Sequence, residues 1–167
     1  MADHESIQKL AQALVNELTA SGKAVATAES CTGGWVAKAI TDISGSSAVF
    51  GYGIVTYSNG AKESIIGVQN KTLEDHGSVS AEVVKEMAKG TLRLSGADIA
   101  VAVSGVAGPD GGTKEKPVGT VWFAWAVRDG ANVLVDTGRE QFKGDRELVR
   151  EASVAYAIQG VRERIES

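Results

Sequence analysis

The stretch Thr27-Ala-Glu-Ser-Cys-Thr-Gly-Gly-Trp35 organises the rest of the chain. An apolar run, residues 24–28, precedes it, and a helix-like segment, residues 35–43, follows it. We therefore expect a strand, a turn of small polar residues and two glycines that open a helix. Backbone N–H groups and the positive end of the helix dipole meet at such a junction, so it suits an anion or a developing oxyanion.

The polar side chains of this stretch have two interpretations. Ser30 can act as a nucleophile if a neighbouring group takes its proton. Alternatively, Ser30 or Thr32 only caps the helix that follows, which is the more frequent use of serine and threonine at such positions. The stretch alone does not decide between these interpretations.

Length and composition are typical of one soluble globular domain spanning residues 1–167. The chain is 43% apolar and 23% charged, with a formal net charge of −4 and no block of Lys or Arg. Nucleic-acid binding is therefore not expected, and no apolar stretch is long enough for a membrane span. The polar N-terminus is unlike a signal peptide, and Cys31 is the only cysteine, so we expect a cytoplasmic protein without an internal disulfide.

Metal ligands are scarce in this sequence. The two histidines, His4 and His76, are far apart and belong to no Cys-x-x-Cys or His-Glu-x-x-His pattern. We expect no structural zinc and no cofactor, while a magnesium ion held loosely by carboxylates stays open.

Hydrophobic periodicity predicts helices that alternate with strands and a hairpin near the C-terminus. The expected strands are residues 24–28, 49–57, 98–104, 118–127 and 133–142. The expected helices are residues 7–18, 32–43, 62–66, 71–75, a segment from Ser80 to Gly96 and a last helix capped by Asp145, with a turn at residues 45–47. This order predicts an α/β fold, a three-layer sandwich in which helices cover both faces of a mixed β-sheet.

Three polar clusters fall at the ends of the expected strands, where ligands bind in such folds. The first is residues 29–32, the second is Tyr57 with Lys62, and the third is Ser104 with the glycine-rich loop of residues 108–112. A serine, a lysine of lowered pKa and a tyrosine form a coherent set for acyl transfer.

These polar groups also have plainer interpretations. Lys62 is then a solvated helix residue, and Tyr57 packs on the sheet with its hydroxyl at the rim. Cys31 is either a rival nucleophile or a small buried thiol. The glycine-rich loop either wraps a phosphate or is a long turn.

Several motifs in one order resemble the CinA C-terminal domain family in its stand-alone form, over nearly the whole chain from Ile7. The motifs are Ala28–Gly34, Tyr57–Asn59 with Lys62, Gly77–Ser80, Ser104–Thr113, Lys116–Val121 and Gly144–Arg146. The resemblance implies an amidohydrolase that converts nicotinamide mononucleotide and water to nicotinate mononucleotide and ammonia, and so returns the nucleotide to NAD synthesis.

The resemblance also implies roles for residues of this chain. Ser30 would be the nucleophile, Tyr57 and Lys62 would activate it and handle protons, and the helix start at residues 32–34 would lie near the acyl oxygen. Residues expected to bind the substrate are Glu29, Cys31, Thr32, Gly33, Gly34, Ser104, Gly105, Gly108, Gly111, Gly112, Thr113 and Arg146. The family usually has threonine where Ser104 stands, and the hydroxyl is kept.

The expected partners are a pyridine nucleotide and further copies of the chain, because apolar strand and helix surfaces suit a symmetric homo-oligomer. The competing functional class is a catalytically silent module that binds a nucleotide or a partner protein, related to competence and DNA damage proteins. Such a module would bind the nucleotide without releasing ammonia.

Overall fold

The computed structural model describes residues 4–165, which form a five-stranded sheet and six α-helices. The elements are α1 His4–Ser21, β1 Val25–Glu29, α2 Trp35–Thr41, the 3-10 helix η1 Ser46–Ala48, β2 Phe50–Val55, α3 Asn59–Ile66, α4 Asn70–His76, α5 Ala81–Ser95, β3 Ile99–Gly105, β4 Thr120–Asp129, β5 Asn132–Gln141 and α6 Arg146–Arg162.

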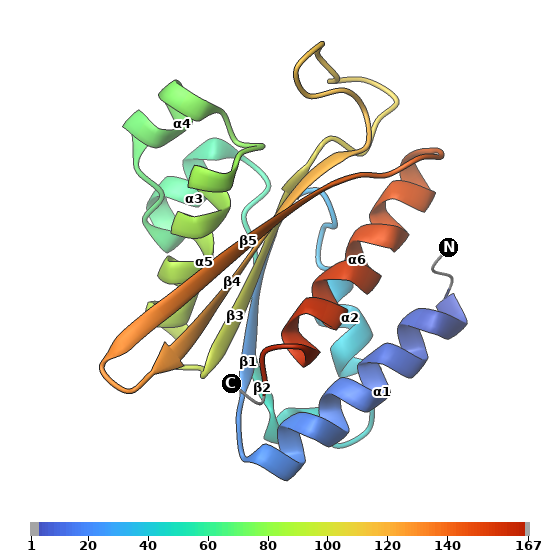
Figure 1. Cartoon of the computed structure of the whole chain (residues 1–167), viewed down its shortest axis with the longest axis vertical. Helices are drawn as coiled ribbons and strands as arrows, with labels where there is room; N and C mark the ends of the chain where they lie inside the picture. Colours follow the sequence, from blue (N-terminus) through green and yellow to red (C-terminus); the bar gives the residue numbers. More distant parts are fainter. Residues whose placement is uncertain (1–3, 166–167) are drawn as a thin grey trace.

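The sheet is mixed, as the sequence predicts, with the strand order β2-β1-β3-β4-β5. Strand β1 is parallel to both β2 and β3, so Thr27 pairs with Gly53 on one side and Val101 on the other. Strands β4 and β5 are antiparallel and form the hairpin. Because β1, β2 and β3 are parallel, their carboxyl ends meet at one edge of the sheet, at the top of Figure 1.

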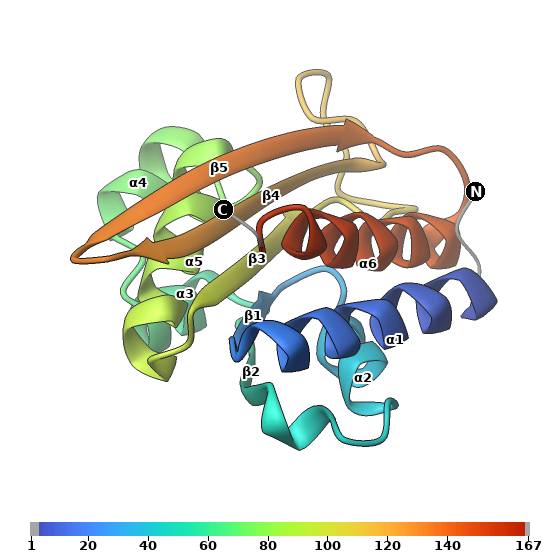
Figure 2. The same ribbon diagram turned by 60° about the horizontal axis from the view of Figure 1, so that its bottom comes forward.

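Helices cover both faces of the sheet, which confirms the three-layer sandwich (Figures 1 and 2). Helices α1, α2 and α6 pack on a face that presents large side chains such as Val101, Phe123 and Trp125. Helices α3, α4 and α5 lie on the other face, which presents small ones such as Ala102 and Ala124. Alternation along each strand separates the two sets of side chains, and alanines let α5 approach the sheet closely.

The predicted caps are confirmed at two helices. The Ser80 side chain accepts a hydrogen bond from the Val83 amide at the start of α5, and Asp145 accepts one from Leu148 at the start of α6. Both caps satisfy amide groups that have no partner within the first helical turn.

Several predicted boundaries differ from those of the structure. Helix α2 begins at Trp35 rather than residue 32, because Gly33 and Gly34 adopt φ angles of 61° and 103°, which a right-handed helix does not accept. The turn expected at residues 45–47 is present and continues into η1, which begins at Ser46. The second strand ends at Val55, so residues 56 and 57 enter the loop above the sheet.

Two features are absent from the part of the chain that the structure describes. No helix within residues 4–165 has the length and apolar content needed to cross a membrane. In the same part of the chain, no group of three or more His, Cys, Asp and Glu residues is placed to hold a metal ion.

Candidate active site

Ser30 and Lys62 meet at the carboxyl edge of the parallel strands. Ser30 directly follows β1, and its amide N–H donates to the Val103 carbonyl over 3.0 Å, which fixes it to the end of β3. Lys62 reaches it from α3 and donates from Nζ to Ser30 Oγ over 3.0 Å. Lys62 Nζ also donates to the Thr56 carbonyl over 2.7 Å, just beyond the end of β2.

Lys62 is among the most buried side chains of the protein, with 1% of its surface exposed. The interpretation of Lys62 as a solvated helix residue is therefore wrong. Burial lowers the pKa of Lys62 from its ordinary value, because a low-dielectric surrounding disfavours the ammonium form. A lysine with a lowered pKa is neutral in a larger fraction of molecules, and a neutral amine can accept a proton from the serine hydroxyl.

Glu29 caps helix α2, so the interpretation that Ser30 or Thr32 caps it is wrong. One Glu29 carboxylate oxygen accepts hydrogen bonds from the Val36 amide at 2.8 Å and the Thr32 hydroxyl at 2.6 Å. The other accepts from the Ala37 amide at 3.0 Å. The carboxylate thus occupies the positive end of α2, and that helix end does not offer its amides to an anion.

Cys31 is a buried thiol with 7% of its surface exposed. Burial, together with the nearby Glu29 carboxylate, raises the pKa of Cys31 to about 12. At neutral pH the sulfur is protonated, and a protonated thiol is a poor nucleophile. The geometry therefore favours Ser30 over Cys31.

Tyr57 lies at the mouth of the site, with 60% of its surface exposed. Its hydroxyl accepts a hydrogen bond from Arg146 Nη2 over 3.1 Å, and Arg146 Nη1 donates to the Gly108 carbonyl over 2.7 Å. Tyr57 approaches Lys62 only through its backbone carbonyl, at 3.5 Å. The structure thus brings Ser30 and Lys62 together and holds the Tyr57 hydroxyl with Arg146, at the first residue of α6.

These residues enclose a cavity of about 310 Å³, a volume in the range of small-ligand sites, ~300–1,000 Å³. The predicted residues that line it are Ser30, Cys31, Tyr57, Ser104, Gly105, Gly108, Gly111 and Arg146. The predicted residues outside its lining are Glu29, Thr32, Gly33, Gly34, Lys62, Gly112 and Thr113. Lys62 nevertheless contacts a residue that lines the cavity, because it donates a hydrogen bond to Ser30.

The end of β3 and two loops form another part of the cavity wall. The Ser104 hydroxyl donates to the Ser78 carbonyl over 2.8 Å and so ties the loop before α5 to β3. Gly108 has a φ of +85°, and a Cβ atom there would clash with Val118. Thr113 lies farther out, where its hydroxyl accepts from the Lys116 amide.

Sequence reasoning missed several residues that shape this cavity. Ser78 and Val79 line it, and the Gly77–Ser80 motif was the available signal. The Thr56 carbonyl, which binds Lys62, carries no sequence signal because every residue has a carbonyl. Arg150, which lines a neighbouring cavity and binds the turn after Ser30, was also missed, although it follows Arg146 by four residues and so lies on the same face of α6.

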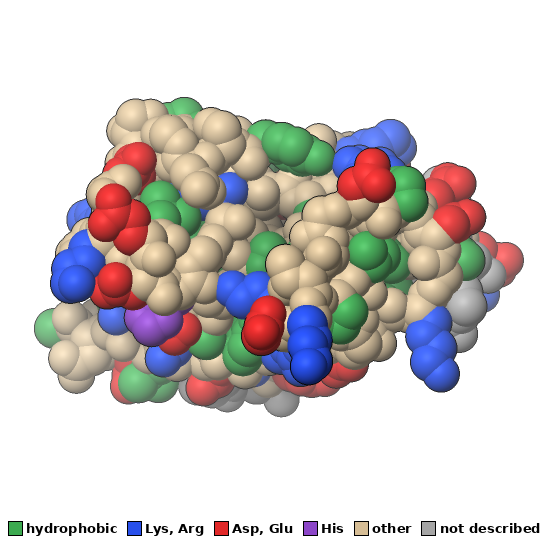
Figure 3. Space-filling view, turned by 90° about the horizontal axis from the view of Figure 1, so that it is seen from above, with side chains coloured by type: hydrophobic (Ala, Val, Ile, Leu, Met, Phe, Trp, Pro, Cys, Tyr) green, Lys and Arg blue, Asp and Glu red, His purple; other side chains and the backbone are tan. Residues whose placement is uncertain are grey.

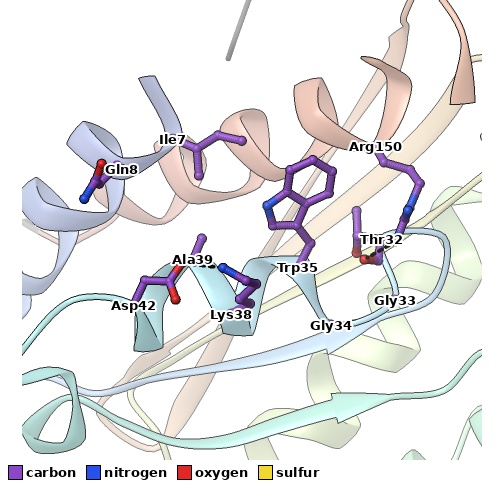
Figure 4. A pocket seen from close by; sticks show the side chains of 10 residues that line it. All are labelled: Ile7, Gln8, Thr32, Gly33, Gly34, Trp35, Lys38, Ala39, Asp42 and Arg150. Atoms are coloured by element: carbon purple, nitrogen blue, oxygen red, sulfur yellow. Dashed lines mark hydrogen bonds and ion pairs between the residues drawn. The ribbon is translucent and has the colours of Figure 1, made fainter. Parts of the chain in front are cut away.

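A larger cavity, of about 710 Å³, is lined by Thr32, Gly33 and Gly34 of the turn that follows Ser30 (Figure 4). Its walls come from α1, α2 and α6, and its lining includes Gly33, Gly34, Trp35 and Arg150. The two cavities share no lining residue, and Ser30 belongs only to the smaller one. We therefore place the candidate active site in the smaller cavity.

The fold and the site together define a class, that of three-layer α/β proteins with a buried serine–lysine pair at the strand ends. A family model described as the CinA C-terminal domain matches residues 7–165, so the chain belongs to that family. The chain is 57% identical over 159 residues to a protein of Escherichia coli K12 named nicotinamide-nucleotide amidohydrolase PncC, and the match covers 95% of this chain and 94% of that protein.

Two further comparisons agree with this assignment. A Pseudomonas putida protein of the same name is 51% identical over 157 residues, which is 94% of this chain and 96% of the relative. The crystal structure of the competence/damage inducible protein CihA from Agrobacterium tumefaciens superposes with a TM-score of 0.90 at 43% identity, and the match covers 97% of this chain and 96% of that one.

Proposed function

We propose that this protein is an amidohydrolase that deamidates nicotinamide mononucleotide through a serine nucleophile. The observation that carries the proposal is the hydrogen bond of 3.0 Å between buried Lys62 and Ser30, at the floor of the cavity. The names of the relatives at 57% and 51% identity support the substrate. The product, nicotinate mononucleotide, would return to NAD synthesis.

In the first half of the reaction, Ser30 Oγ attacks the carboxamide carbon, and its proton passes to neutral Lys62 Nζ. The carbonyl π electrons move to oxygen and give a tetrahedral oxyanion. When the C–N bond breaks, the leaving nitrogen takes the proton from the Lys62 ammonium and departs as ammonia. Ser30 is left as an ester of the nicotinate carboxyl group.

In the second half, water attacks the ester carbon and gives its proton to Lys62. Collapse of the second oxyanion breaks the bond to Ser30 Oγ, which regains a proton from Lys62. This half yields nicotinate mononucleotide and free enzyme. Over both halves, one amide and one water are converted to one carboxylic acid and one ammonia. The step requires no redox partner.

Arg146 and the glycine-rich loop would bind the nucleotide part of the substrate. The Arg146 guanidinium is the cation that lines the cavity, and guanidinium groups bind phosphates with several hydrogen bonds. Tyr57, held by Arg146, would contact the substrate from the same side and would handle protons only if its hydroxyl reached the leaving nitrogen. Cytoplasmic location and homo-oligomeric assembly stay predictions.

Ammonia release from nicotinamide mononucleotide tests the proposal. We expect chelator-resistant release by the wild type, and a fall in kcat of roughly 10³-fold or more in Ser30→Ala. Ser47→Ala, at an exposed serine in η1, is the matched control and should behave as wild type. Stoichiometric nucleotide binding by a folded wild type without ammonia release would favour the silent binding module instead.

A further inference from the structure

Three successive carbonyl oxygens, those of Ser30, Cys31 and Thr32, accept hydrogen bonds where the chain turns after β1. Arg150 Nε donates to the Cys31 carbonyl over 3.1 Å, and Arg150 Nη2 donates to the Thr32 carbonyl over 3.2 Å. The Gly33 amide donates to the Ser30 carbonyl over 3.0 Å. Figure 4 shows Arg150 reaching from α6 to this turn. One side chain therefore fixes two successive peptide units beyond the nucleophile.

The bound carbonyls also fix the direction of the amides. In a trans peptide the N–H points opposite to the C=O. The Cys31 amide belongs to the peptide unit whose carbonyl is that of Ser30, and the Thr32 amide belongs to the unit whose carbonyl is that of Cys31. Because Arg150, which lines the larger cavity, binds the Cys31 carbonyl, the Thr32 amide on the opposite edge of that unit faces away from Arg150. The Gly33 amide holds the Ser30 carbonyl and so sets the direction of the Cys31 amide.

Cys31 lines the active-site cavity, whereas Thr32 lines the larger one but directs its amide away from Arg150. The Cys31 and Thr32 amides are therefore the candidates to stabilise the oxyanion. The first amides of α2 are not alternatives, because those of Val36 and Ala37 already donate to the Glu29 carboxylate. Stabilisation of the oxyanion depends on donors that are fixed before the reaction. Arg150 fixes the Thr32 amide directly, through the Cys31 carbonyl. It fixes the Cys31 amide indirectly, because the Gly33 amide of the second peptide unit that it binds holds the Ser30 carbonyl.

The position of Arg150 is itself well determined. Its guanidinium lies 5.8 Å from the centre of the Trp35 ring. Gly33 lets it approach, since a Cβ atom at that position would lie 3.2 Å from Arg150 Nη2. A planar guanidinium can bind two carbonyls at once in a fixed geometry, which a lysine ammonium does less well.

We propose that Arg150 is a positioning residue, which holds the peptide units after Ser30 so that their amides form the oxyanion site. The inference rests on the proposed serine chemistry. Arg150 itself lines only the larger cavity and does not line the one that contains Ser30. It acts through the turn and does not contact the substrate.

Kinetics of Arg150→Ala test the proposal. Removal of one oxyanion donor costs ~10²–10³ in kcat, so loosening both donors should lower kcat roughly 10- to 100-fold with KM within about two-fold. The rate at which a fluorophosphonate labels Ser30 should fall in parallel. Lys38→Ala is the matched control, because Lys38 lines the same cavity but pairs with Asp42. It should change neither rate.

Chemical rescue separates positioning from general stability. In Arg150→Ala, ethylguanidinium should enter the vacated space and restore kcat and labelling with saturation, whereas ethylammonium should not. Arg150→Lys keeps the positive charge but not the planar fork, and it replaces Arg150→Ala in these experiments if the alanine variant does not fold. Its kcat should also fall, and ethylguanidinium should restore only part of the lost rate. Wild-type rates in either variant, or losses that ethylguanidinium leaves unchanged, would overturn the proposal.

The labelling assay keeps this inference distinguishable from the proposed function. If wild-type protein releases no ammonia but its Ser30 is labelled, the substrate assignment is wrong, and the labelling rates still decide on Arg150. If Ser30 is not labelled in the wild type, the serine chemistry is wrong, and the role of Arg150 is overturned with it.

Discussion

Ser30 and Lys62 lie 32 positions apart in the sequence and share one hydrogen bond in the fold. A lysine buried to this degree destabilises the folded chain, because its charged form is unfavourable there. The same burial lowers the pKa of Lys62, which raises the neutral fraction of the amine and makes it a better proton acceptor. At the scale of single residues, burial of Lys62 thus lowers the stability of the fold and raises the reactivity of the site.

The pH dependence of Lys62→Met should show both effects. We expect the wild-type kcat/KM to rise with pH through the lowered pKa of Lys62, since only the neutral amine accepts the Ser30 proton. Lys62→Met should lose roughly 10³-fold in kcat. The exposed Lys89→Met is the matched control. A flat profile for the wild type across this range would contradict the role of Lys62 as base.

Stability should change with pH in a defined direction. Between the lowered pKa of Lys62 and its ordinary value of 10.5, the unfolded chain binds more protons than the folded chain. The wild-type free energy of unfolding should therefore rise with pH relative to that of Lys62→Met across this interval. At pH values below the lowered pKa, the destabilisation caused by the buried ammonium group has its full size. Denaturant titrations of both proteins at several pH values measure the difference.

Cys31 should be dispensable. With its pKa raised to about 12, its thiolate fraction at pH 8 is roughly 10³ below that of a free thiol. Cys31→Ala should keep kcat within about three-fold, and iodoacetamide should alkylate the folded wild type far more slowly than the unfolded chain. Rapid alkylation with a parallel loss of ammonia release would instead make the thiol the nucleophile.

At the scale of elements, the contact between α3 and α5 sets the position of Lys62. Gly90 of α5 lies against the backbone of Ile66, one turn after Lys62 on α3, and a Cβ atom at Gly90 would clash with the Ile66 carbonyl. Alanine usually stabilises a helix relative to glycine by ~0.5–1 kcal/mol. Here the clash reverses that preference, because α3 must move.

Gly90→Ala should therefore lower both stability and activity. We expect overpacking to cost about 1–3 kcal/mol, and the shift of α3 to lengthen the Ser30–Lys62 contact and reduce kcat. Thermal unfolding and ammonia release measure the two effects. Gly51→Ala on β2 is the matched control, since nothing lies within 4 Å of its added Cβ. A Gly90→Ala protein as stable and active as the control would contradict this account.

Elements with strong local signals were predictable from the sequence. The 7–18 periodicity, the Ser80 and Asp145 caps and the apolar run of β3 all specify their structure over short distances. The start of α2 was mispredicted, because positive φ angles at Gly33 and Gly34 depend on the turn that Arg150 and Glu29 hold from outside.

The site was predictable only in part, for the same reason. Motifs pointed to Ser30 and Lys62, but the burial that distinguishes Lys62 from a solvated lysine arises from packing of α3 on the sheet. The use of Glu29 as the cap of α2 and the hydrogen bonds of Arg150 join residues distant in the sequence. Local patterns carry no information on such contacts.

At the scale of the whole molecule, the face that holds the strand ends mixes charges of both signs (Figure 3). With a formal net charge of −4, we expect no measurable retardation of duplex or single-stranded DNA at physiological salt. An electrophoretic mobility assay checks this, with a salt titration as control. Retardation that weakens steeply with salt would instead support the alternative of a module that binds macromolecules.

The most direct test of serine catalysis is to trap the acyl-enzyme. Wild-type protein mixed with nicotinamide mononucleotide and quenched in acid should carry a nicotinate-nucleotide ester on the peptide that contains Ser30, and mass spectrometry of the digest locates it. Cys31→Ala should carry the same adduct and Ser30→Ala none. An adduct on Cys31, or undiminished ammonia release by Ser30→Ala, would contradict the account.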